Sequence, residues 1–150
     1  MTNLEEMHPE SVQELKDNFG RQELPKSVIE LSELEKQCEG NPDLESLLGE
    51  MIEYCERYTE TVAQYQELDS KEETRETKEE LANLDKERKI VHDATTDSIN
   101  ILARALNSTG KNGRWIESLH SSRAAYGSFA LRMTYQRLIE MEVENGKDQR

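Results

Sequence analysis

The chain of 150 residues is poor in the residue types that build β-sheets, disulfide frameworks and membrane spans. Aromatic residues make up 5% of it and hydrophobic residues 34%. No window alternates β-branched and polar residues, so strands are not expected. Two cysteines, Cys38 and Cys55, do not make a disulfide framework, and their places on apolar stripes predict buried, inert thiols. No apolar run approaches the roughly 20 residues that span a bilayer, so no membrane insertion is expected.

The first ten residues, MTNLEEMHPE, lack the basic and apolar segments of a secretory signal. We therefore expect a cytoplasmic protein with reduced thiols. Proline is absent after Pro42, which removes the strongest helix breaker from most of the chain. Glu and Lys are abundant instead, and both favour helix over strand. These features together predict an all-α fold.

The charge is distributed unevenly along the chain. Residues 1–69 carry 18 acidic and 5 basic residues, residues 70–106 carry 9 and 7, and residues 107–150 carry 5 and 7. The net charge of −13 disfavours a nucleic-acid binder that acts through bulk charge. An acidic N-terminal half favours a basic protein as the partner.

Prolines and glycines mark where the helices begin and end. Pro9 and Gly20 bracket a short helix over residues 10–19, and Pro25 and Gly40 bracket another. Asn41-Pro42 is a strong start signal for a long helix over residues 42–68. This helix has seven consecutive heptad positions with spacings of four and three residues: Leu44, Leu48, Met51, Cys55, Tyr58, Val62 and Tyr65.

A Ser-x-x-Glu capping box from Ser70 to Glu73 predicts a connection between two helices, and one continuous helix through residues 72–80 is the alternative. The apolar pattern returns over residues 81–106, and residues 107–113 form a loop. The last helix is expected over residues 114–144. Gly127 in its middle indicates close contact with another helix.

We thus expect an antiparallel helical bundle of three long helices with one or two shorter N-terminal helices. It would be one domain over residues 10–144, with a flexible arm at 1–9 and a tail at 145–150. The outer face of the helix over 42–68 is strongly acidic and is the predicted interaction face for a basic protein. Its residues are Glu45, Glu50, Glu53, Glu56 and Glu60.

His120 supports two chemical alternatives. Glu117 and His120 form a Glu-x-x-His pair of the kind that helical bundles use to bind two metal ions. The segment from Leu119 to Ala124 resembles the phosphoacceptor helix of histidine phosphotransfer domains. That resemblance implies that His120 carries a phosphate and that Arg123 neutralises it. Ala124 stands where that family has glycine.

The leading hypothesis is a non-enzymatic protein that acts through protein–protein interaction, with self-association as a further expectation because the heptad stripe is long. It includes no catalytic residue, metal or cofactor. One alternative is a phosphorelay or metal-dependent bundle protein that uses His120. Another is an acidic decoy or immunity-type inhibitor that occupies the nucleic-acid site of a basic protein.

Overall fold

The computed structural model describes residues 28–69 and 74–148, and this part of the chain contains helices and no strand. The predicted all-α class is therefore confirmed. The predicted arm over residues 1–9 and the short helix over 10–19 lie outside the described residues. The helices are α2 (Leu31–Cys38), α3 (Pro42–Asp69), α4 (Arg75–Ser108), the 3₁₀-helix η2 (Arg114–Ser121) and α5 (Arg123–Asp148). Among these, no helix combines the length and the apolar character that a bilayer span requires.

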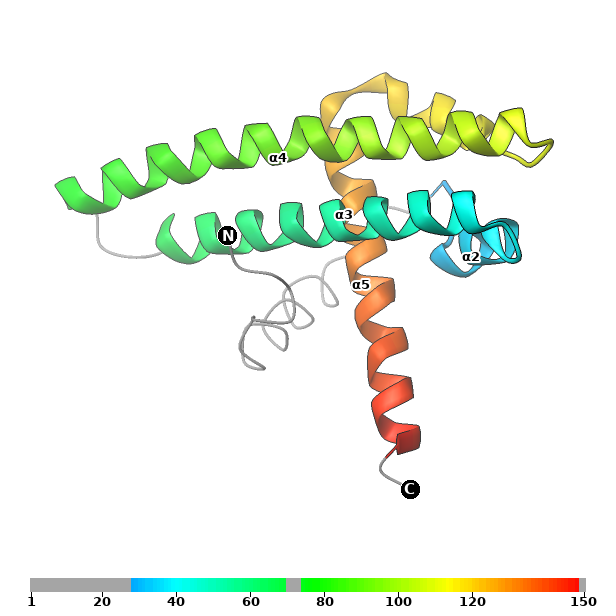
Figure 1. The fold of residues 1–150 in the computed structure, drawn as a ribbon. Coiled ribbons are helices and arrows are strands. Elements are labelled where there is room, and N and C mark those ends of the chain that lie inside the picture. Colours follow the sequence, from blue (N-terminus) through cyan, green and yellow to red (C-terminus); the bar gives the residue numbers. More distant parts are fainter. Residues whose placement is uncertain (1–27, 70–73, 149–150) are drawn as a thin grey trace.

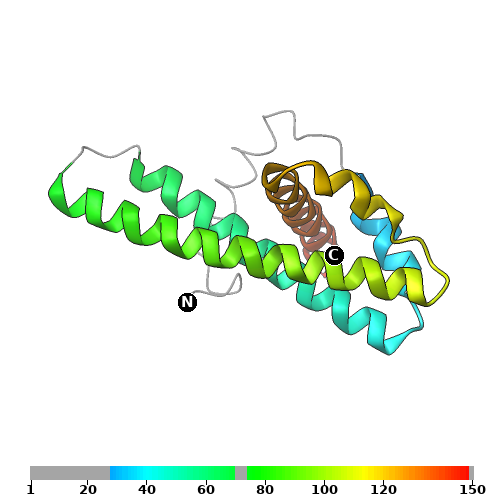
Figure 2. The same cartoon turned by 90° about the horizontal axis from the view of Figure 1, so that it is seen from above.

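Helices α3 and α4 form a long antiparallel pair (Figures 1 and 2). The start of α3 is as predicted, because Asn41 Oδ1 accepts hydrogen bonds from the backbone N–H groups of Asp43 (3.1 Å) and Leu44 (3.2 Å). Since α3 ends at Asp69 and α4 begins at Arg75, the alternative of one continuous helix is wrong.

The capping box of α4 lies four residues beyond the predicted one. Thr74 is the N-cap, and its hydroxyl accepts from the Thr77 N–H at 3.2 Å while the Thr77 hydroxyl accepts from the Thr74 N–H at 2.7 Å. Ser70 and Glu73 lie outside the described residues. Thr-x-x-Thr supplies the same two reciprocal hydrogen bonds as Ser-x-x-Glu.

The expectation of a single last helix over residues 114–144 is wrong. Residues 114–121 form the 3₁₀-helix η2, and Ser122 is fully extended with φ −167° and ψ 160°. The Ser122 hydroxyl accepts from the Ala125 N–H at 3.1 Å, so this serine caps α5 instead of continuing a helix. At the other end α5 runs to Asp148, beyond the expected stop at residue 145.

This break redirects the chain, and α5 lies steeply across the α3–α4 pair (Figures 1 and 2). An antiparallel bundle of all three long helices is therefore not confirmed. Small residues on α5, namely Gly127, Ala130 and Thr134, are buried and allow the close approach. The close contact expected at Gly127 is confirmed, because a Cβ there would lie 2.9 Å from Tyr58 Oη of α3.

The hydrophobic core lies where α2, η2 and α5 meet the N-terminal half of α3 and the C-terminal half of α4. Trp115 of η2 stacks on Phe129 of α5, with ring centroids 5.4 Å apart. Helix α2 packs its buried Leu31, Leu34 and Cys38 into the same cluster. Because α2 and α5 both contact α3, they flank a stretch of its surface, and this stretch is the candidate site.

Candidate functional site

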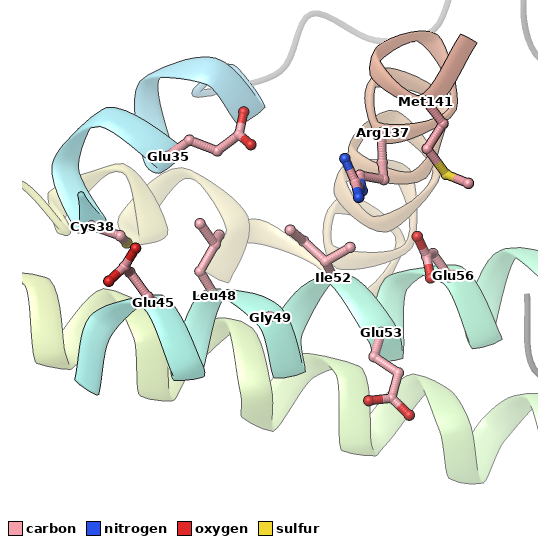
Figure 3. Close-up of a pocket in the computed structure, with 10 residues that line it drawn as sticks. All are labelled: Glu35, Cys38, Glu45, Leu48, Gly49, Ile52, Glu53, Glu56, Arg137 and Met141. Atoms are coloured by element: carbon pink, nitrogen blue, oxygen red, sulfur yellow. The ribbon is translucent and has the colours of Figure 1, made fainter. Parts of the chain in front are cut away.

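A groove of about 510 Å³ lies between α2 and α5, with α3 as its floor (Figure 3). Leu48, Gly49 and Ile52 of α3 form this floor. The wall on the α2 side includes Glu35 and Cys38, and the wall on the α5 side includes Arg137 and Met141. The groove therefore has apolar surface at its base and charged side chains at its edges.

The charge of the groove is mainly negative. Four carboxylates line it, from Glu35, Glu45, Glu53 and Glu56, against the single guanidinium of Arg137. Arg137 Nη1 lies 3.3 Å from Glu140 Oε2, which partly offsets this one positive charge. In Figure 3 Glu53 points away from the space between α2 and α5. Its carboxylate pairs instead with Arg57, at 2.5 Å.

The predicted interaction face is thus only partly assembled. Glu45, Glu53 and Glu56 line the groove, whereas Glu50 is exposed outside it. The prediction for Glu60 is wrong, because this residue is buried with 7% of its surface exposed. It follows Thr59, where α5 crosses α3, and Gln64 Nε2 donates to its carboxylate at 3.3 Å.

The two cysteines are buried, as predicted. Burial raises the pKa of the Cys38 thiol, and the negative charge of Glu45 raises it further. Burial likewise raises the pKa of Cys55, with a smaller contribution from Glu56. Since a thiolate is the reactive form of cysteine, Cys38 does not supply the groove with a nucleophile at neutral pH.

His120 is exposed on η2, which meets one requirement of a phosphoacceptor. Its Nε2 lies 3.4 Å from Asn100 Oδ1, which also accepts a hydrogen bond from the Tyr126 hydroxyl at 3.1 Å. Arg123 begins a different helix, and its guanidinium lies 2.8 Å from Asp93 of α4. The structure therefore directs Arg123 to a carboxylate on α4, and the one-helix arrangement implied by the resemblance is absent.

Glu117 and His120 both lie on η2 and are exposed. In the described ranges 28–69 and 74–148, no three or more His, Cys, Asp or Glu side chains are grouped so that they could hold a metal ion. A two-metal site of the bundle type needs further carboxylates beside such a pair. The groove on α3, which encloses a volume and gathers charged side chains, is therefore a better candidate site than the exposed Glu117–His120 pair.

Comparison with known proteins adds no further assignment: neither a protein-family model, nor a curated protein, nor a solved structure matches the chain.

Sequence reasoning found the carboxylates of α3 but missed what α2 and α5 contribute. Glu35, Arg137 and Met141 reach the groove through tertiary packing, which no local pattern encodes. Gly49 was a readable signal, because it is an exposed glycine inside α3, beside the apolar heptad position Leu48. A glycine in a helix interior lowers helix stability and often marks a close approach.

Proposed function

We propose that the protein is a non-enzymatic binding protein whose partner is a basic protein held in the groove on α3. The observation that carries this proposal is the groove itself. It has an apolar floor and four lining carboxylates, of which only that of Glu53 points away, against one guanidinium. Apolar contact supplies affinity in such a site, while the carboxylates select cationic partners and speed their association.

The uneven charge of the chain supports the same proposal. The acidic N-terminal segment includes α2 and α3, which provide all four carboxylates of the groove. An inhibitor that covers the nucleic-acid site of a basic protein is one particular form of this function. It uses the same electrostatic complementarity, and the identity of the partner distinguishes the two.

The test compares two variants of equal charge. The groove variant carries Glu35→Gln, Glu45→Gln and Glu56→Gln. The control carries Glu76→Gln, Glu79→Gln and Glu80→Gln, which remove three exposed carboxylates from the start of α4. Tagged proteins are incubated with nuclease-treated lysate at about 50 mM and about 300 mM salt, because exposed charges are screened within about 10 Å at 0.1 M. Retained proteins are identified by mass spectrometry.

We expect the wild type and the control to retain the same basic protein at low salt and to release it at high salt, and the groove variant not to retain it. Equal retention by both variants would contradict a role for the groove. If no basic protein is retained at either salt concentration, the proposed function is wrong. His120→Ala should leave retention unchanged, since His120 lies on η2, outside the groove.

A further inference from the structure

Gly49 is a helix-interior glycine that the described packing does not explain. A Cβ added at this position meets nothing within 4 Å. Its backbone is not in the left-handed region either, since the described glycines with positive φ are Gly40 and Gly110. Gly127 differs, because a Cβ there would approach Tyr58. The absence of a side chain at residue 49 thus leaves space that nothing in the described chain fills.

This space borders the groove floor. Gly49 is exposed between Leu48 and Ile52, so the backbone of α3 is bare between α2 and α5 (Figure 3). Two helices normally pack with their axes 8–10 Å apart, and the distance depends on the side chains at the contact. A glycine at the crossing point lets a partner backbone come closest.

We infer that the occupant of the groove is an amphipathic α-helix that crosses α3 at Gly49. This inference rests on the proposed function and names the form of its partner. The apolar stripe of the helix would contact Leu48 and Ile52, as helices bound in grooves commonly do. Its Lys or Arg residues would lie toward Glu35 and Glu45, at the end of the groove opposite Arg137 and Met141 (Figure 3).

The probe is a synthetic peptide of about five helical turns, roughly 18 residues, made of Leu, Ala and Lys. Leu residues at i, i+3, i+4 and i+7 give it one apolar stripe. A scrambled peptide of the same composition keeps the charge but breaks the stripe. A third peptide has Glu in place of Lys. Binding to the full-length protein is measured by fluorescence anisotropy, and methyl NMR shifts locate the contact.

We expect the amphipathic cationic peptide to bind about tenfold more tightly than the scrambled one and to shift the methyl signals of Leu48 and Ile52. The Glu peptide should not bind. Gly49→Met fills the floor of the groove and should weaken binding about tenfold. Ser46→Met is the matched control, because Ser46 is exposed on α3 but does not line the groove. It should leave binding unchanged.

The inference is overturned if the two cationic peptides bind equally or if Gly49→Met binds as tightly as the wild type. The proposed function would still stand in that case if the groove variant, with its three Glu→Gln changes, no longer bound the cationic peptides. If no cationic peptide binds, the helical partner is wrong, and the lysate experiment decides separately whether the proposed function fails with it. Circular dichroism verifies that Gly49→Met is folded, and Gly49→Ala serves as a second variant with a smaller expected loss.

Discussion

The two mid-helix glycines Gly49 and Gly127 have opposite surroundings, although local sequence treats them alike. Gly49 faces open space, while the Cβ position of Gly127 lies 2.9 Å from Tyr58 Oη. Tyr58 also contacts His92 of α4 edge-on, with ring centroids 5.4 Å apart, so a shift of its ring would disturb this contact. The same substitution should therefore have different effects at the two positions.

Gly49→Ala is expected to raise the free energy of unfolding by about 1 kcal/mol, because alanine is the better helix former. Gly127→Ala should give no such gain in the wild type, since the new methyl group displaces Tyr58. In a Tyr58→Phe background the gain at residue 127 should return. Denaturant unfolding of the single and double variants measures this. Equal stabilisation at both glycines would show that Tyr58 does not restrict residue 127.

The buried thiol of Cys55 should make stability depend on alkaline pH. Burial raises its pKa in the folded state above the ordinary value of 9.0. Above about pH 9 the unfolded chain loses this proton and the folded chain keeps it, so stability falls as pH rises. When the pH rises from about 8 to about 10.5, the free energy of unfolding of Cys55→Ala should fall by about 2 kcal/mol less than that of the wild type.

Chemical unfolding of both proteins at the two pH values tests this. Cys55→Ala is expected to be the less stable protein at the lower pH, because it leaves a small cavity in the core. Identical pH dependence of the two proteins would mean that the thiol ionises alike in the folded and unfolded states.

At the scale of elements, the N-caps of α3 and α4 lie in different surroundings. Asn41 caps α3 beside the buried Leu44, within the core. Thr74 caps α4 where the first turn is mostly exposed. The two caps use similar hydrogen bonds, but loss of the first also disturbs a segment that packs against α2.

We expect Asn41→Ala to lower the free energy of unfolding by about 1 kcal/mol. Thr74→Ala should chiefly increase amide hydrogen exchange in the first turn of α4, with a smaller effect on global stability. Denaturant unfolding and hydrogen exchange of both variants measure the difference. A larger global loss from Thr74→Ala would mean that the start of α4 is part of the cooperative core.

At the scale of the whole molecule, α3 and α4 extend beyond the crossing of α5 as a two-helix arm (Figures 1 and 2). A second cavity of about 420 Å³ lies on this arm, between the partly buried Leu68 of α3 and Leu84 of α4. Ile90 of α4 is 70% exposed. Self-association stays a prediction, in which a second arm would pack on these apolar side chains and complete a four-helix arrangement.

Sedimentation equilibrium from micromolar to millimolar protein tests this expectation. The mean mass should rise toward that of a dimer, and Leu84→Lys should keep the protein monomeric by placing a charge in the contact. Lys86→Ala, an exposed change on the same helix, is the control. A constant monomer mass over the whole range would contradict self-association.

The sequence alone determined the all-α class, the start of α3 at Asn41-Pro42, the burial of the cysteines and the close contact at Gly127. These follow from caps, heptad spacing and residue size, which act over a few neighbouring residues. Only the tertiary structure decided that Ser122 begins a new helix, that α5 crosses the pair and that Glu60 is buried. It also joined Glu35 and Arg137 to the floor at Gly49, because a groove between three helices depends on contacts distant in sequence.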